Sequence, residues 1–443
     1  MFEGFRTWGA ASRGGSSAKR EFGIGVLRGN LFWLVVCQCV WQFTTNIPSP
    51  YLPLYIQSLG GSPADIGLVR SAAAIAGLFL YPLGGYIADK QGRVKLVSVA
   101  TVVYAFSFIP FAFAPNWETL AVASFLQNLV LFYSPILTVL QADSMPAGMR
   151  GQGFAVAISV PGALGIISPF IGGYLVDAMG IIPGMRLVYN VGFGAGLLVA
   201  ALRWVTLRET LDPAKAQKID YRNIPKVFKD SYLSFLETLR WMPDQIRVLA
   251  VMQMMQIFFN GVAASYWILY ATAIIGISAT TWGLNSAIQG SVNMLFAIPA
   301  GRMMDRFGRR RLLIPMMCLV PVFPLAFLFI KDYVGLALLV VLMSIANAFL
   351  RPGFQSLLAD YTPRERRGRV TSAVGGGNFF VDIRGTGYGG GMLLFIPAAV
   401  AQTLGGVLYE ANPMIPFMVM SAGMVIVIIW AFLRVKEPVK MET

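Results

Sequence analysis

The chain has 443 residues, of which 56% are hydrophobic and only 13% are charged, and its mean hydropathy is +0.65. Soluble domains carry about 45–50% apolar and about 25% charged residues, so the composition excludes an ordinary soluble domain and indicates lipid as the solvent. The net charge of +14 does not indicate nucleic-acid binding, because the basic residues lie in short turns between apolar segments. The absence of histidine excludes histidine-ligated metal sites and Ser-His-Asp catalysis, and we expect neither a metal nor another cofactor.

The first half of the chain predicts a bundle of membrane-spanning helices. Residues 1–30 are basic and rich in Gly and Ser, with no apolar region and cleavage site of a signal peptide, so we expect a cytoplasmic tail. The bundle covers residues 31–207, and each apolar segment in it is long enough to cross a bilayer. The six predicted spans are 31–57, 64–88, 94–114, 117–141, 153–176 and 186–207.

A polar segment, 208–245, separates this bundle from the second half. Its apolar residues recur at helical spacing among basic ones, which predicts an amphipathic helix lying in the inner membrane interface. A second bundle follows over residues 246–433, with a Gly-rich insertion at 375–391 and a cytoplasmic tail at 434–443. Its predicted spans are 246–275, 281–304, 312–330, 332–358, 392–410 and 413–433.

The placement of Lys and Arg predicts the orientation. Both tails, the 208–245 segment and the other strongly basic loops fall on one side of this threading, which the positive-inside rule places in the cytoplasm. We therefore predict a multi-pass protein of the plasma membrane, in contact with lipid, with both termini cytoplasmic.

The second half repeats motifs of the first half. Gly85, Asp89, Gly92 and Arg93 close the second span, and Gly301, Asp305, Gly308 and Arg309 repeat them with the same internal spacing at the end of the eighth span. A second pair follows the fourth and tenth spans, where Asp143 with Arg150 matches Asp360 with Arg367 at nearly the same offset along the chain. Two motif pairs with nearly the same offset predict two six-helix halves of like topology, with a cavity between them.

The doubled motif G-x-x-x-D-[RK]-x-G-R-x-[RK] resembles that of the major facilitator superfamily, and the resemblance extends over nearly the whole chain. It implies an all-α membrane protein with 12 transmembrane helices in two pseudo-symmetric bundles, working as a secondary transporter by alternating access. It also implies that Asp89 and Asp305 make a contact across the cytoplasmic gate that forms in the outward-facing state and breaks in the inward-facing state. Gly92 and Gly308 are expected to allow the sharp turn after each helix.

Polar side chains on the spans that line the cavity of this family are candidate substrate ligands. Arg351 lies about 13 Å from the inner end of its helix, close to the membrane midplane, where a charged residue is read as functional. Asn347 precedes it by one helical turn. Arg70 lies nearer a span end and is expected to snorkel. The remaining candidates are amides that recur on single helix faces, the alternative being hydrogen bonds between helices: Gln42, Asn46, Gln253, Gln256, Asn260, Gln289 and Asn293.

A midplane arginine, with no carboxylate expected at the same depth, favours an anionic or zwitterionic solute. A different hypothesis comes from the fifth span, where Ser168, Pro169, Gly172 and Gly173 resemble part of a motif of proton-coupled drug exporters. The match is incomplete, because the first glycine of that motif is serine here and the arginine that such exporters carry on the fourth span is replaced by Ala123. Close helix packing is the plainer reading of the two glycines.

No motif for catalysis or nucleotide binding occurs, so we predict a carrier and not an enzyme. The predicted partners are a small-molecule solute and a coupling ion such as a proton, and we expect a monomer. A membrane sensor that has lost transport is the remaining alternative.

Overall fold

The structure is a computed structural model that describes residues 28–90, 92–145, 149–210, 224–363, 366–376 and 391–436. Within those ranges every regular element is helical. The predicted tails therefore lie almost entirely outside the described residues, as do residues 377–390 of the Gly-rich insertion.

The N-terminal bundle contains six spans, four of which are built from more than one helix. α1 and α2 form the first span, with a break at Ile47 and Pro48 where the 3₁₀ turn η2 follows. In chain order the elements are α1 (Asn30–Asn46), η2 (Ser49–Tyr51), α2 (Leu52–Ser58), α3 (Pro63–Lys90), α4 (Arg93–Phe106), α5 (Phe108–Ala112), α6 (Trp117–Val130), η3 (Leu131–Tyr133), α7 (Ser134–Asp143), α8 (Arg150–Gly165), α9 (Ser168–Met179) and α10 (Ile181–Thr206).

The C-terminal bundle repeats this order after the connecting helix α11 (Ile224–Trp241). Its first span is interrupted at Ser265 and Tyr266, between α12 and α13, as the first span of the other bundle is interrupted at η2, and it ends in the π turn η7. In chain order the elements are α12 (Asp244–Ala264), α13 (Trp267–Tyr270), η7 (Ala271–Ile275), α14 (Ala279–Phe307), α15 (Arg309–Leu319), α16 (Val322–Phe329), α17 (Tyr333–Tyr361), α18 (Arg367–Val374), α19 (Met392–Ala411) and α20 (Ile415–Arg434).

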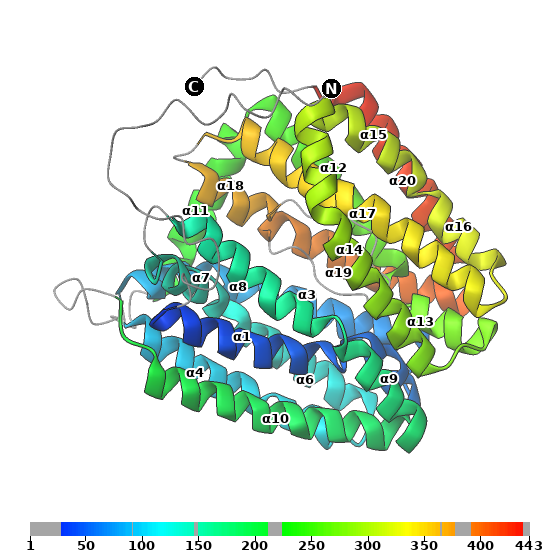
Figure 1. The fold of residues 1–443 in the computed structure, drawn as a ribbon, viewed down its shortest axis with the longest axis horizontal. Helices are drawn as coiled ribbons and strands as arrows, with labels where there is room; N and C mark the ends of the chain where they lie inside the picture. The colour runs from blue at the N-terminus through cyan, green and yellow to red at the C-terminus, as the bar shows by residue number, and fades with distance from the viewer. Residues whose placement is uncertain are drawn as a thin grey trace, which may run out of the picture.

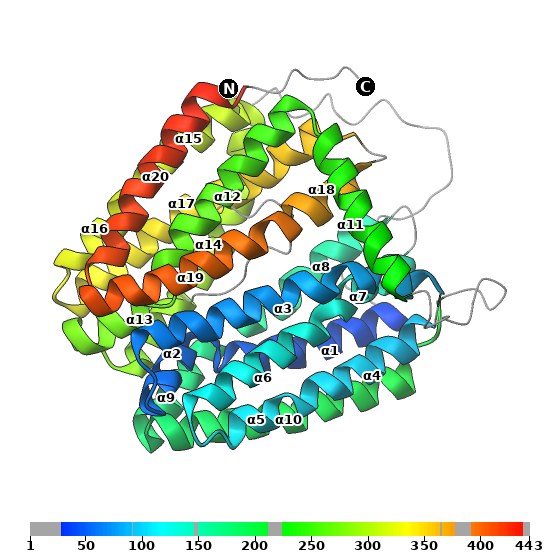
Figure 2. The same ribbon diagram turned by 180° about the vertical axis from the view of Figure 1, so that it is seen from behind.

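The two bundles form a V (Figure 1). They lie closest at the end that carries α2, α9 and α13, and they lie apart at the end that carries α11 and α18, as the view from behind also shows (Figure 2). Contacts between the bundles run mainly between α3 and α19 and between α9 and α14. We call the two ends of the molecule the α2–α13 end and the α11–α18 end.

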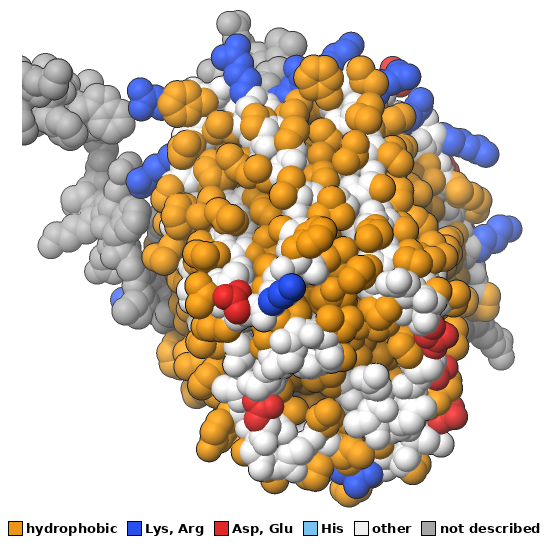
Figure 3. Space-filling view, turned by 90° about the vertical axis from the view of Figure 1, so that its right-hand side faces the viewer, with side chains coloured by type: hydrophobic (Ala, Val, Ile, Leu, Met, Phe, Trp, Pro, Cys, Tyr) orange, Lys and Arg blue, Asp and Glu red, His pale blue; other side chains and the backbone are white. Residues whose placement is uncertain are grey.

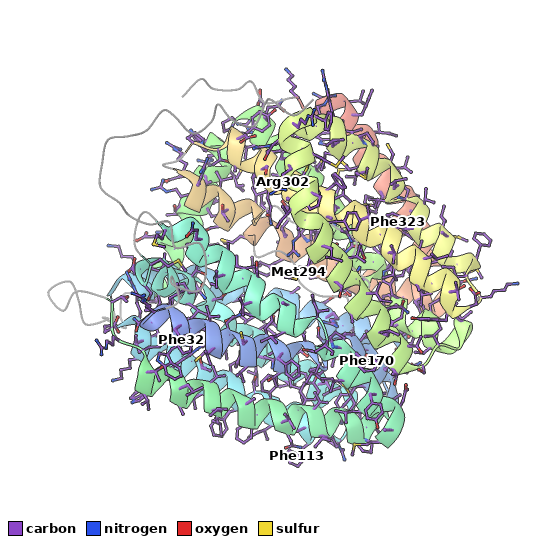
Figure 4. All side chains as sticks on the ribbon, in the orientation of Figure 1. Phe32, Phe113, Phe170, Met294, Arg302 and Phe323 are labelled. Atoms are coloured by element: carbon purple, nitrogen blue, oxygen red, sulfur yellow. The ribbon has the colours of Figure 1, made fainter. Side chains whose placement is uncertain are left out.

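The surface matches a lipid environment. Nine helical segments of the described residues are long and apolar enough to cross a membrane by length and composition, and the other three of the twelve spans run through α1, α3 and α14. Figure 3 shows a face that is mostly hydrophobic, with Lys and Arg side chains gathered along its upper edge. Phe113 projects from the rim of the N-terminal bundle (Figure 4) and is 66% exposed, which would be costly in water.

Local sequence explains where several helices begin. Asn116, Ser278 and Asp332 each accept a hydrogen bond from a backbone N–H in the first turn of α6, α14 and α17, at 3.0–3.2 Å. Such caps satisfy amide groups that have no partner within the helix. Helices α8, α14, α15, α17 and α19 each contain an internal proline, which packed transmembrane helices tolerate.

Helix α11 touches both bundles at the α11–α18 end. The Tyr232 hydroxyl donates to the Leu78 carbonyl of α3 at 3.0 Å, and burial raises the pKa of this phenol, which keeps it a donor. The Arg366 guanidinium, next to α18, lies 4.1 Å from the ring centre of Trp241. Val227 and Thr238 are buried, whereas Leu233 and Leu236 are nearly half exposed, so the helix packs through one face.

Candidate functional site

A cavity of about 520 Å³ lies mainly in the N-terminal bundle. Its volume falls in the range of sites for small ligands. The first four spans, from α1 to α7, supply most of its wall, and Phe395 of α19 closes it from the other bundle. An ideal Cβ on Gly77 would lie 2.6 Å from the Phe395 ring, so this glycine lets the ring of one bundle approach the helix of the other. Movement of one bundle relative to the other would therefore change the shape of the cavity.

Arg70 is the charged residue among those that line the cavity. Around it the wall combines amides with aromatic rings: Asn46, Gln127, Asn128, Tyr104, Phe108, Phe111, Phe132 and Tyr189. The rings of Phe111 and Tyr189 are stacked at 4.8 Å between their centres, a favourable contact in this part of the wall. Among the lining residues in the described part of the chain there is no carboxylate, so the cavity combines one positive charge with polarizable apolar surface.

The predicted amides of the first span lie beside α8. An ideal Cβ on Gly165 would meet the Asn46 side-chain nitrogen at 2.8 Å and the Gln42 side chain at 3.2 Å. Asn46 also lines the cavity, whereas Gln42 does not. The structure thus brings Asn46 and Arg70 into one site, while sequence reasoning assigned Arg70 to the membrane edge.

The predicted amides of α12 and α14 belong to the C-terminal bundle and do not line this cavity. Gln253, Gln256 and Gln289 are at most 1% exposed. Both side-chain polar atoms of Gln253 and of Gln289, and one oxygen each of Asn260 and Asn293, have no hydrogen-bond partner in the described structure. Unsatisfied buried amides are costly, so water or a ligand is the expected partner.

The predicted pair on α17 also lies away from the cavity. Asn347 is buried and Arg351 is exposed, although they are one helical turn apart. Substrate binding by this pair, and by the amides of the C-terminal bundle, stays a prediction.

The repeated basic motifs form equivalent ion pairs inside each bundle. Arg93 pairs with Asp143 in the first bundle, and Arg309 pairs with Asp360 in the second. Arg309 also lies 3.7 Å from Asp305 on the preceding helix. Each pair ties the start of the third span of a bundle to the end of the fourth.

Of the remaining motif residues, the structure describes the contacts of Arg367. Arg367 donates to the Ala359 carbonyl at 3.2 Å, which keeps it beside the end of α17. The surroundings of Gly85 and the side chains of Asp89 and Arg150 lie outside the described part of the chain. The expected roles of these three residues therefore stay predictions.

Gly92 and Gly308, which follow the two helices that carry the motif, have different structural roles. Gly308 has φ +95°, a conformation that favours glycine, and it ends α14 in the sharp turn expected from the sequence. Gly92 has φ −52°, which any residue adopts. Its constraint is space, because an ideal Cβ would lie 2.9 Å from a carboxylate oxygen of Glu209, which accepts a hydrogen bond from the Val94 amide at 3.0 Å.

The exporter-like motif of the fifth span lies where α9 meets α14. Ser168 is fully buried, and the Pro169 carbonyl accepts a hydrogen bond from Tyr51 at 2.5 Å. Ideal Cβ atoms on Gly172 and Gly173 would lie 2.4 and 2.2 Å from the carbonyl oxygens of Ile47 and Ala279. The glycines therefore allow direct contact between backbones, with Ala279 belonging to the other bundle.

The part of the chain that the structure describes contains no candidate metal site. No group of three or more Cys, Asp or Glu side chains there could hold a metal ion.

Comparison with known proteins places these features in a family. The sequence profile of the Major Facilitator Superfamily matches residues 34–259 and 248–443. The multi-drug resistance efflux pump PmrA homolog of Lactococcus lactis is 25% identical over 73% of this chain and 78% of its own length. The multidrug resistance protein MdtG of Serratia proteamaculans is 26% identical over 73% of this chain and 77% of its own length. The solved structure of the nucleoside transporter NupG superposes with a TM-score of 0.61 at 14% identity, covering 92% of this chain and 98% of that one.

The family model and the transporters among the relatives and solved structures define a membrane transporter rather than an enzyme. The chain belongs to the Major Facilitator Superfamily.

Proposed function

We propose that this transporter exports small amphiphilic solutes that carry a negative charge, either organic anions or zwitterions. The observation that carries the proposal is the cavity, in which Arg70 stands among aromatic rings and amides. A guanidinium pairs with carboxylate or sulfonate groups, and the rings favour a flat apolar body. Export is supported by the names of the relatives, which are multidrug efflux proteins.

The predicted ligands of the C-terminal bundle extend this proposal. Arg351 and Asn347 on α17, with the buried amides of α12 and α14, would contact the same solute from the other side at a different stage of the cycle. The orientation proposed for this transporter puts the α11–α18 end in the cytoplasm, which the positive-inside rule supports because the strongly basic loops belong to that end. The V-shaped structure is then the inward-facing state. The proposed transporting unit is a monomer, and the proposed coupling ion is a proton.

A second candidate is proton-coupled export of amphiphilic cations. It is favoured by the relatives' names and by the exporter-like motif at Ser168 to Gly173, and opposed by the absence of a carboxylate among the described lining residues. The two candidates differ in the sign of the charge that the cavity accepts.

A ligand panel on purified protein separates them. A ligand at 100 times its Kd adds about 2.7 kcal/mol to the free energy of unfolding, which a melting curve resolves. We expect aromatic carboxylates and sulfonates to stabilise the wild type and to lose this effect in Arg70→Ala. The matched control is Arg186→Ala, because Arg186 donates to the Ala114 carbonyl and does not line the cavity. Stabilisation by lipophilic cations and not by anions would refute the anion proposal and favour the second candidate.

A further inference from the structure

Two helix crossings join the bundles: α9 with α14, and α3 with α19. At each crossing a tyrosine hydroxyl from a third element lies within hydrogen-bonding distance of carbonyls on both crossing helices. Tyr51 reaches Pro169 O at 2.5 Å and Ala279 O at 3.1 Å. Tyr266 reaches Pro63 O at 3.2 Å and Gln402 O at 3.4 Å. Each tyrosine therefore links its own bundle to the other one.

A carboxylate completes each crossing. Asp177, near the end of α9, accepts hydrogen bonds from the backbone amides of Ala279 and Thr280 at 3.1 and 2.7 Å. Glu410, near the end of α19, accepts from the Ala64 amide at 3.0 Å. The donors lie in the first turns of α14 and α3, where backbone N–H groups have no partner within the helix and the helix dipole favours a negative charge. A side chain of one bundle thus caps a helix of the other.

The two crossings use equivalent residues of the two halves. Glu410 follows Gly405 at the same spacing at which Asp177 follows Gly172. Tyr266 corresponds to Tyr51, to within one residue, at the offset that relates the basic motifs. The capped helices, α3 and α14, carry those motifs at their far ends. The same contact is therefore built twice, with the roles of the two halves exchanged.

At each crossing the backbones of the two helices lie close together, because glycines leave no side chain between them. Ideal Cβ atoms on Gly173 and Gly283 would lie 2.2 and 2.4 Å from carbonyl oxygens across the first crossing. On Gly67 and Gly406 they would lie 2.4 and 2.7 Å from carbonyl oxygens across the second. Larger residues would hold the helices apart, beyond the reach of the tyrosines and carboxylates.

We propose that Asp177 and Glu410, together with Tyr51 and Tyr266, form a two-part lock that keeps the α2–α13 end closed. In each part the carboxylate and the tyrosine join one bundle to the other, so these links break when the bundles rotate to open this end. The ion pairs Arg93–Asp143 and Arg309–Asp360 lie within single bundles and survive that movement. The lock rests on the family's two-bundle movement and not on the identity of the solute.

Distances between spin labels test the lock without any substrate. The full chain, with its three cysteines replaced by serine, carries labels at Pro115→Cys and Lys331→Cys, two exposed loop positions at the α2–α13 end of opposite bundles. Double electron–electron resonance on this protein is expected to give one short distance. Asp177→Ala and Glu410→Ala are each expected to raise the ratio of open to closed molecules about tenfold, and together about a hundredfold, because they remove charge-assisted hydrogen bonds at separate sites.

Glu118→Ala is the matched control, because this exposed carboxylate lies in the first turn of α6 at the same end and in neither crossing. It should leave the distance unchanged. Should the double variant not fold, Tyr51→Phe and Tyr266→Phe remove only the hydroxyls and are expected to shift the same ratio in the same direction. An unchanged short distance in the carboxylate and tyrosine variants would overturn the lock, as would an equal shift in Glu118→Ala. None of these results depends on whether the solute is an anion.

Discussion

Substituting Gly173 by alanine tests the close contact between α9 and α14. The new methyl carbon would start 2.2 Å from the Ala279 carbonyl oxygen, whereas real contacts of this kind rarely fall below 3.0 Å. The helices must therefore separate by about 1 Å. That movement carries the hydrogen bond between Asp177 and the Thr280 amide, now 2.7 Å long, beyond its useful range. Overpacking of this kind typically costs about 1–3 kcal/mol.

The assay is thermal unfolding of purified protein, followed by intrinsic tryptophan fluorescence. Gly194→Ala is the matched control, because an ideal Cβ at this position in α10 meets nothing within 4 Å. In a helix interior alanine is favoured over glycine by up to about 1 kcal/mol, so the control should melt at the wild-type temperature or above it. Gly406→Ala should fall between the two, since its Cβ would lie 2.7 Å from the Pro63 carbonyl.

The order of the three melting temperatures decides the result. If Gly173→Ala melts at or above the wild type, the backbones do not touch at this crossing. If it melts no lower than Gly406→Ala, the loss comes from something other than the closer contact with Ala279.

Three further predictions concern the charged groups. Arg93→Ala should lower the melting temperature more than Arg309→Ala, because the Arg93 side chain is 11% exposed and that of Arg309 is 27% exposed. Removing one partner of an ion pair costs more stability where the pair is more buried. Equal losses in melting temperature would contradict this. Asp89→Asn and Asp305→Asn should slow transport in proteoliposomes while ligand affinity stays within a few fold, since both aspartates are expected to act on the cytoplasmic gate. Unchanged turnover in both variants would refute that role. Arg351→Ala should abolish high-affinity binding of an anionic solute in a titration, and unchanged affinity would make Arg351 structural.

The repeat made the fold predictable. Motif pairs at nearly equal offsets indicated two halves of like topology, and the structure and the family comparison confirm two six-helix bundles. Hydropathy located the spans because each one has to bury about 20 residues in lipid. It did not show the break at Ile47 and Pro48, although Pro48 lacks the backbone N–H that a continuing helix needs.

The site was less predictable, and Arg70 shows why. Its place near one end of a span suggested that the guanidinium would extend toward the membrane surface. Only the packing of neighbouring helices against α3 shows that this side chain lines a cavity. Counting residues gives depth along a helix but not the direction in which a side chain points.

Asp177 and Glu410 were hidden from sequence reasoning for a related reason. Each lies at the C-terminal end of its own helix, where the dipole disfavours a carboxylate, and nothing nearby in the sequence compensates. The compensation comes from the start of a helix that lies far away along the chain, in the other half of the protein. Partners so distant in sequence follow from the tertiary fold alone.

The exchanged roles at the two crossings have the geometry of a dimer. When two identical subunits meet around a twofold axis, a residue i of one contacts j of the other, and j of the first contacts i of the second. Here the helix that carries Asp177 in the first half meets α14 of the second, and the helix that carries Glu410 in the second half meets α3 of the first. Each half therefore supplies one carboxylate, one tyrosine and one capped helix start, which is the set of contacts that a twofold dimer of half-length chains needs.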